Sequence, residues 1–146
     1  MKFSAAISLF ATMVVADWTS QCSSWSSSSN RRSLKATCTS DSGSEVCSTL
    51  DLNDCLAFNG SALIWQVDGN FSPVGASLND GIAECVNAQE LCTYLSSSSS
   101  SSTDFECYCY NPDSSSLVDV SIDLAEQISV NGDGYLTCLG QVASSC

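Results

Sequence analysis

The sequence contains no histidine, and this absence removes two arrangements of nucleophilic catalysis from consideration. A Ser-His-Asp triad and a Cys-His pair both need an imidazole to accept the proton of the nucleophile. Histidine is also the commonest metal ligand, and the cysteines lack the Cys-x-x-Cys spacing of zinc sites. We therefore expect no metal, no cofactor and no histidine-dependent catalysis.

Basic residues are scarce as well. Four lysines and arginines stand against 16 aspartates and glutamates, which gives a net charge of −12. Such a surface repels the phosphates of nucleic acids and the headgroups of anionic lipids. The sequence therefore predicts that the partners are neither nucleic acid nor an anionic membrane surface.

Long apolar runs are missing, and the one apolar stretch near the start is typical of a secretory signal. Residues 1–16 combine Lys2, an apolar stretch over 5–15 and a plausible cleavage site at Ala16. That stretch is too short to span a bilayer, and no later run is long enough either. All ten cysteines follow the cleavage site, and an even number in a small secreted domain indicates up to five disulfides. We expect a secreted, extracellular protein whose mature part, residues 17–146, is one disulfide-stapled domain.

The chain carries one pattern twice, over about residues 33–65 and 104–138. Each copy has a segment with a cysteine, a Leu/Ile-Asp-Leu segment, a turn with Asn-Gly or Asp-Gly, and a final strand. These parts are 34–38, 50–56, 59–60 and 63–65 in the first copy, and 105–109, 122–128, 131–134 and 135–138 in the second. A repeat of this size does not bury a core alone, so we expect the two copies to share one.

Each copy predicts strands joined by one helical turn. Alternating apolar residues over 34–38 and 105–109 indicate half-buried strands, and a second strand follows over 46–50 or 117–122. Asp51 and Asp123 then have the position of helix N-caps, each with an acid three residues later. We expect short helical turns over 51–56 and 123–128 in an otherwise all-β fold.

Aligning the two copies predicts some of the disulfides. Cys22–Cys38 and Cys92–Cys109 become equivalent disulfides, each of which closes a hairpin. Cys85–Cys107 is a neighbouring bridge, and the alternative exchanges the partners of Cys85 and Cys92. The sequence alone does not pair the other four, Cys47, Cys55, Cys138 and Cys146.

Serine tracts and sequons mark candidate modification sites. Residues 26–29 and 96–102 are serine tracts between a cysteine and the first strand of a repeat. We interpret both as solvated loop tips, with O-glycosylation as the alternative. Asn59 and Asn70 begin Asn-x-Ser sequons, so we expect a glycoprotein.

The repeated pattern resembles the cyanovirin-N homology family, and in particular its secreted, cysteine-rich members from filamentous fungi. The segment "TLDLNDCL…NG…LIWQ…GNF" over 49–71 carries the resemblance, together with "ECVNAQ" over 84–89. The family implies a pseudo-symmetric all-β ellipsoid with two tandem repeats, here about 17–70 and 82–140. Strand exchange intertwines them, so that each half has a three-stranded sheet and a hairpin from the other repeat. The implied oligomeric state is a monomer or a strand-swapped dimer.

Members of this family are typically lectins for mannose-type oligosaccharides. In the half that contains the chain termini, the resemblance implies a carbohydrate-binding site at Asn131, Asp133 and Gly134, with Gln21, Thr39 and Asp41. In the other half the pattern is eroded, and only Asn70 and Glu84 remain as a second, weaker site. The expected partners are therefore mannose-type glycans or glycoproteins bound at one site.

Simpler interpretations of the same residues remain open. The turn over 131–134 uses residue types that favour any tight turn. It is not a calcium loop, because Ser129 and Gly140 stand where acids are needed. Trp65 ends an apolar strand and is expected in the core rather than as a sugar-stacking platform. Trp18 and Trp25 are interpreted in the same way, with Trp18 expected to be the more exposed of the two.

Two other classes of function compete with a lectin. Paired carboxylates hydrolyse glycosides in some enzymes, but the acids here fall at caps and turns, so we expect no enzyme. The alternative function is a secreted, disulfide-rich interaction or effector protein that keeps the lectin fold without sugar binding. Fold alone does not separate these two.

Overall fold

The computed structural model describes residues 17–28, 32–69, 103–111 and 116–146. These residues form short strands and three 3-10 turns, which confirms the predicted all-β class. In chain order the elements are η1 (Trp18–Gln21), β1 (Cys22–Ser27), β2 (Ser33–Thr39), β3 (Glu45–Asp51), η2 (Leu52–Asp54), β4 (Leu56–Phe58), β5 (Leu63–Trp65), β6 (Asp104–Asn111), β7 (Ser116–Asp123), η3 (Leu124–Glu126), β8 (Ile128–Val130), β9 (Leu136–Cys138), β10 (Gln141–Val142) and β11 (Ser144–Ser145). No helix in this part of the chain is long and apolar enough to cross a membrane.

Several sequence-based expectations concern residues outside these ranges. They are the signal segment 1–16, the serine tract 96–102, Asn70, Glu84, Cys85 and Cys92.

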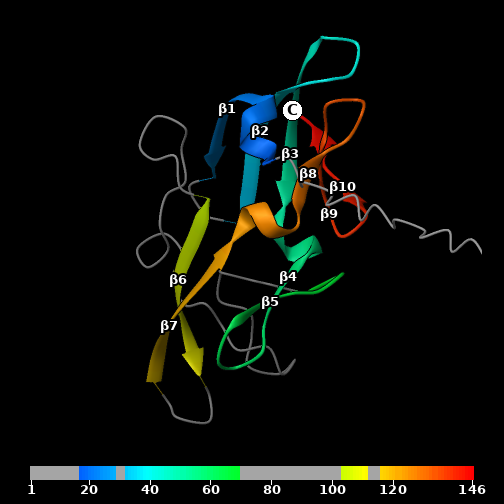
Figure 1. Cartoon of the computed structure of the whole chain (residues 1–146). Helices are drawn as coiled ribbons and strands as arrows, with labels where there is room; N and C mark the ends of the chain where they lie inside the picture. The colour runs from blue at the N-terminus through cyan, green and yellow to red at the C-terminus, as the bar shows by residue number, and fades with distance from the viewer. Residues whose placement is uncertain (1–16, 29–31, 70–102, 112–115) are drawn as a thin grey trace, which may run out of the picture.

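The strands form antiparallel groups at two ends of the molecule (Figure 1). At one end β1, β2, β3 and β11 make a four-stranded sheet, and β10, β9 and β8 make a three-stranded one beside it. At the other end β4 pairs with β5, and β6 pairs with β7. Among the described residues, this second half shows two strands, β6 and β7, of the three-stranded sheet that the resemblance implies.

The two repeats are intertwined, as the resemblance implies. The β8–β9 hairpin of the second repeat lies against β3 of the first, where Leu136 N–H donates to Ser48 Oγ at 3.0 Å. Conversely, β5 of the first repeat lies against β7 of the second, and Trp65 Nε1–H donates to Glu126 at 3.2 Å. Each half is thus completed by a hairpin from the other repeat.

One hydrophobic core serves both repeats. Alternation in β2 directs Leu34, Ala36 and Cys38 inward, and each is 1% exposed or less. Phe105 in β6 and Leu124 in η3 are fully buried in the same cluster. This shared burial explains why neither repeat needs a core of its own.

The tryptophans test the predicted core. Trp65 is partly buried and packs against the cluster, in agreement with its predicted place. Trp18 also lies in the core as expected, because η1 packs against β8. The expectation that Trp18 is more exposed than Trp25 is wrong, since Trp18 is 1% exposed and Trp25 is only partly buried. The ring of Trp18 meets that of Trp25 edge to face, with centroids 5.5 Å apart. Local sequence does not show this, since the covering strand lies over 100 residues away.

The first serine tract is partly misassigned by the sequence. Ser26 and Ser27 belong to β1 rather than to a loop, and Ser27 is 2% exposed. They pair with Lys35 and Leu34 of β2. Pairing with a neighbouring strand satisfies the backbone groups of these serines, and this overrides their preference for solvated loops.

Both predicted helical turns are present, as single 3-10 turns of three residues. Asp51 caps η2 by accepting from Asn53 N–H at 3.0 Å, and Asp123 caps η3 in the same way from Ala125 N–H at 2.9 Å. The predicted turns end too late, because Leu56 and Ile128 already begin β4 and β8.

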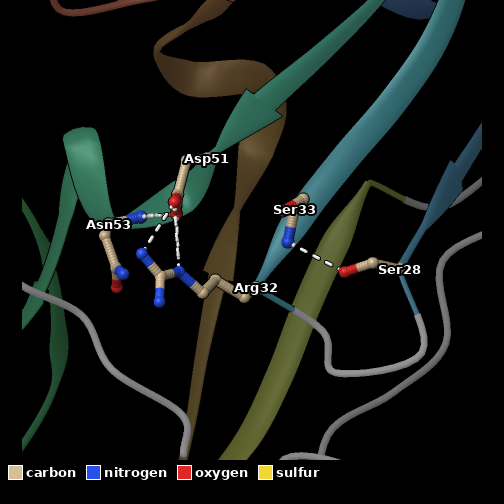
Figure 2. A network of polar contacts seen from close by, with 5 residues as sticks. All are labelled: Ser28, Arg32, Ser33, Asp51 and Asn53. Carbon is tan, nitrogen blue, oxygen red and sulfur yellow. Dashed lines mark hydrogen bonds and ion pairs between the residues drawn. The ribbon is translucent and has the colours of Figure 1, made fainter. Parts of the chain in front are cut away.

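Each capping aspartate is held by a residue just before the first strand of its own copy, which is β2 or β6. Arg32 donates to the Asp51 carboxylate through Nε and Nη2 at distances of 2.9 to 3.2 Å (Figure 2). Its carbonyl also accepts from Leu52 N–H. In the second copy Thr103 fills both roles toward Asp123 and Leu124. The duplication therefore reproduces a hydrogen-bonding scheme even where the residue type differs.

The disulfides divide into two kinds. Cys22–Cys38 links β1 to β2 within the first repeat, the pairing that the register of the copies predicts. Cys47–Cys146 and Cys55–Cys138 link the first repeat to the second, over separations of 99 and 83 residues. Cys107 and Cys109 are also disulfide-bonded. The partners that the alignment of the copies predicts for them, Cys85 and Cys92, lie outside the described residues.

Replacing Ser48 with alanine is expected to lower the free energy of unfolding by about 1–3 kcal/mol. Ser48 is fully buried, and its hydroxyl accepts the N–H of Leu136 from the other repeat. The substitution leaves that N–H buried without an acceptor. Denaturant unfolding measures the loss. The control is Ser121→Ala, at an exposed serine of β7 whose side chain makes no hydrogen bond among the described residues. A cost no larger than that of the control would show that the bond does not join the repeats.

Candidate functional site

The turn between β8 and β9 is built by Asn131. Its Oδ1 accepts the N–H groups of Asp133 at 3.1 Å and of Tyr135 at 2.9 Å. Its backbone carbonyl accepts from Gly134 N–H, and its own N–H donates to Tyr135. The side-chain oxygen of Asn131 is therefore committed to the turn, while no hydrogen bond engages its Nδ2 among the described residues.

The loop between β2 and β3 is the second part of the candidate site. It is a tight serine-rich turn in which Ser40 N–H donates to Ser44 O, and Gly43 N–H to Ser40 O. The Ser40 hydroxyl is buried at the base of the loop and bonds to Ser42 and Ser44. Asp41 is exposed at its tip.

The structure brings these two segments of different repeats together. Asp41 N–H donates to Gly132 O at 2.9 Å. Gly132 also lies against the Asp41 carboxylate, because a Cβ added there would come within 2.7 Å of Oδ2. Gly134 is buried against Val46 and Ser40, at 3.0 and 3.2 Å from an added Cβ. The turn over 131–134 thus rests directly on the loop that carries Asp41.

Gln21 and Thr39 flank this contact. Gln21 ends η1 immediately before Cys22, and Cys22 pairs with Cys38, their Cα atoms 3.8 Å apart. Because the pairing is antiparallel, Gln21 and Thr39 follow at the same end of the β1–β2 ribbon. Thr39 in turn pairs with Glu45 at the base of the loop.

The side chains at this surface are free to meet a ligand. Asp41, Asp133 and Thr39 are exposed, and Gln21 is partly exposed. No hydrogen bond involves these four side chains within the part of the chain that the structure describes. The two carboxylates only accept hydrogen bonds, the glutamine amide donates and accepts, and no cation is among the predicted residues. This is the chemistry of a surface that binds hydroxyl groups.

The structure changes the roles of two predicted residues. Gly134 is buried and supports the turn, so its part in the site is to permit close packing at a φ of +88°. Asn131 offers one amide donor rather than a donor and an acceptor. The sequence did not single out Ser42 and Ser44, two exposed residues of the same loop as Asp41 whose hydroxyl groups bond to each other. The only local sign of them was the Ser-Gly-Ser turn composition.

The second predicted site is only partly described. Its candidate residues Asn70 and Glu84 lie outside the described ranges. The equivalent turn after β4 is present, and Asn59 builds it as Asn131 does in the other repeat. Asn59 Oδ1 accepts from Ser61 N, Ser61 Oγ and Ala62 N at 3.0 to 3.1 Å. No acidic residue follows Asn59 in this turn, in contrast to Asp133.

Two other features of the described residues bear on the site. A hollow of about 100 Å³ lies on the β1–β2 ribbon, and none of the six predicted residues lines it. In the same part of the chain, no group of three or more histidine, cysteine, aspartate or glutamate side chains is placed to hold a metal ion. The candidate site is therefore the exposed junction of the turn over 131–134 with the loop over 40–44.

We compared this architecture with proteins of known structure and with protein families. The NMR structures of a designed Cyanovirin-N homolog lectin, LKAMG, match at a TM-score of 0.60 and 17% identity, covering 84% of this chain and 98% of that one. The NMR structure of GzCVNH from Gibberella zeae matches at a TM-score of 0.56 and 17% identity, covering 84% and 97%. No curated protein matches the sequence significantly. The family model of the CVNH domain matches residues 18–137, and the chain therefore belongs to the CVNH family.

Proposed function

We propose that this protein is a secreted lectin that binds mannose-type oligosaccharides where the turn over 131–134 meets the loop over 40–44. The CVNH fold is a lectin fold, which supports carbohydrate binding at the level of the family. The observation that carries the proposal for this chain is the bond from Asp41 N–H to Gly132 O. It joins two segments from different repeats, and each presents an exposed carboxylate that makes no hydrogen bond among the described residues.

The chemistry suits a pair of neighbouring sugar hydroxyl groups. A vicinal diol needs acceptors for its protons and donors for its lone pairs, all within a few ångströms. Asp41 and Asp133 accept, Asn131 Nδ2 donates, and Gln21 and Thr39 do both. Such a surface is shallow, so a single site binds weakly unless several sites are linked together.

Replacing Asp133 with alanine is expected to weaken binding of an α1→2-linked mannoside by about tenfold or more, which corresponds to the loss of a charge-assisted hydrogen bond. Asn131→Asp keeps the Oδ1 acceptor that holds the turn but removes the Nδ2 donor. We expect it to weaken binding similarly, with little change in stability. Asn131→Ala should lower stability as well, because Asp133 and Tyr135 lose their acceptor. Calorimetry or NMR titration with mannose oligosaccharides measures the affinities.

Asp119→Ala is the matched control, since Asp119 is an exposed carboxylate on β7 in the other half. It should leave the affinity unchanged. Binding that survives both Asp133→Ala and Asn131→Asp would place the site elsewhere. No binding by the parent protein would contradict the lectin function itself.

An exposed apolar pair favours the alternative, a secreted interaction or effector protein. Tyr108 on β6 and Leu117 on β7 are 44% and 51% exposed, and the strand register places them on the same outer face of the hairpin. Exposed aromatic and apolar side chains are typical of protein-binding surfaces. A glycan array on the mature protein separates the two functions, because only the lectin gives a signal.

Secretion and glycosylation belong to the same proposal. All eight cysteines among the described residues are in disulfides, which indicates an oxidising compartment such as the extracellular space. Asn59 is exposed in its sequon, and its Nδ2, the atom to which a glycan is attached, makes no hydrogen bond among the described residues. We propose that Asn59 carries a glycan and that the protein is a monomer, with the strand-swapped dimer as the alternative.

A further inference from the structure

Residues 141–146 cross from one sheet to the other. After the turn at Leu139 and Gly140, β10 pairs back onto β9. Ala143 is buried, and its N–H donates to Leu136 O at 2.9 Å. The chain then leaves this sheet, and β11 pairs with β3 as its outer neighbour. We call residues 141–146 the strap, because they hold the hairpin that carries the candidate site against the sheet of the first repeat.

The Cys47–Cys146 disulfide fastens the strap. Few other interactions with the described residues hold β11 in place. They are the two register pairs with Ser48 and Thr49, the Ser144 hydroxyl on Thr49 O, Cys146 N–H on Cys47 O, and a contact between Thr49 Oγ1 and Cys146 Sγ at 3.6 Å. Its residues Ser144 and Ser145 are exposed and contribute no apolar burial. Ordering the strap costs conformational entropy. Without the disulfide, few interactions remain to offset that cost.

The described disulfides differ sharply in access to solvent. Cys22, Cys38, Cys55 and Cys138 are buried, at 8% exposed or less. By contrast, Cys146 is exposed and Cys47 is partly exposed. Thiol–disulfide exchange requires a thiolate to reach a sulfur in line, so access controls the rate. A thiol reductant should therefore attack Cys47–Cys146 before the other two.

We propose that Cys47–Cys146 is a thiol-sensitive latch that controls the strap and, through it, the glycan-binding surface. A reductant thiolate attacks one sulfur and forms a mixed disulfide, and a second thiol of the reductant resolves it. The reductant is oxidised to its own disulfide, and Cys47 and Cys146 gain two electrons and two protons to become thiols. Cys55–Cys138 stays closed and keeps the two repeats joined.

The latch lies next to the site. Val46 directly precedes Cys47 and contacts the position where Gly134 ends the site-forming turn. The strap also continues the sheet behind that turn, since β10 pairs with β9. Release of β11 uncovers the edge of β3 at Ser48 and Thr49, and Ser48 holds Leu136 at the foot of the same turn. Opening the latch therefore loosens the contact between the turn and the loop that carries Asp41.

The order of reduction tests the latch without any ligand. The oxidised protein is treated with dithiothreitol at increasing concentration, free thiols are alkylated, and peptides are identified by mass spectrometry. Cys47 and Cys146 should be modified at concentrations that leave Cys22, Cys38, Cys55 and Cys138 unmodified. Hydrogen exchange on the same samples should show lost protection at Ser144, Cys146 and Thr49, with β2 unchanged. Earlier modification of any of the four buried cysteines, or unchanged exchange, overturns the proposal.

A double variant, Cys47→Ser with Cys146→Ser, mimics the open latch. We expect it to remain folded, to show the exchange pattern of the reduced protein and to be insensitive to dithiothreitol below the concentration that opens the buried disulfides. Unfolding of this variant overturns the proposal, because Cys55–Cys138 would then be insufficient to hold the repeats.

The effect on binding rests on the proposed lectin function. Affinity for a mannose oligosaccharide should fall by about fivefold or more on reduction and in the double variant, within the usual range of coupling between sites. Equal affinity in the oxidised and open forms contradicts control of the site. If the oxidised parent binds no mannoside, the lectin function fails, while the alkylation and exchange results still decide whether the latch exists.

Discussion

Removing both disulfides that join the repeats is expected to lower the free energy of unfolding by about 7–8 kcal/mol, whereas removing either one alone should cost about 3 kcal/mol. The two bridges are nested, since Cys55–Cys138 lies inside the loop closed by Cys47–Cys146. Their separations of 99 and 83 residues differ by 16. While one bridge is closed, the other therefore adds only the constraint of a short ring. When both are open, the constraint of the long loop is lost too.

The prediction is therefore that the stability losses from the two disulfides are not additive. Denaturant unfolding of Cys47→Ser/Cys146→Ser, Cys55→Ala/Cys138→Ala and the fourfold variant measures the three losses. The fourfold variant should lose more than the two double variants together, and a loss of this size is comparable with the whole stability of a typical domain. Cys55 and Cys138 are buried, so alanine there adds a small cavity cost. A fourfold loss no larger than the sum of the two double-variant losses would refute the nested-loop argument.

Replacing Gly134 with alanine is expected to cost about 3 kcal/mol, roughly twice or more the cost of Gly43→Ala. Both glycines have left-handed backbones, with φ of +88° and +83°. Gly43 is open to solvent and has no atom within 4 Å of an added Cβ. Gly134 packs against Val46 and the backbone nitrogen of Ser40 at 3.0 to 3.2 Å. Gly43→Ala thus measures the conformational strain alone, and the difference measures the close packing of the turn.

The same pair of variants reports on the site. Because Gly134 sets the turn over 131–134 against the loop over 40–44, Gly134→Ala should weaken mannoside binding as well as stability. Gly43→Ala changes the loop without pushing it from the turn, so its affinity should stay close to that of the parent. Thermal unfolding and titration of both proteins provide the comparison. If the two substitutions lowered the free energy of unfolding equally, the turn would be able to move away from Val46 and Ser40 at no cost. The contact seen here would then not position the site.

Short-range patterns were enough to predict the elements of this fold. Asp51 and Asp123 cap their turns, and Leu34 and Phe105 point into the core, because capping and strand alternation depend on residues a few positions apart. The duplication predicted that the repeats share a core. It also predicted Cys22–Cys38, since those cysteines face each other across a single hairpin.

Contacts between distant segments were decided only by the tertiary structure. Trp18 is buried by β8, and Ser27 by its place in a sheet, and neither burial is visible in the local sequence. Cys47–Cys146 and Cys55–Cys138 pair across the two repeats, and only the path of the strap brings the first pair together.

The candidate site shows the same division. The sequence, through the family resemblance, named Asn131, Asp133 and Asp41 as polar residues of one site. Only the structure shows that the Oδ1 of Asn131 is used up in its own turn, and that Asp41 is held by Gly132 of the other repeat. The physical reason is that residue type determines which hydrogen bonds a side chain can make, whereas the packing of two intertwined repeats determines which of them remain for a ligand.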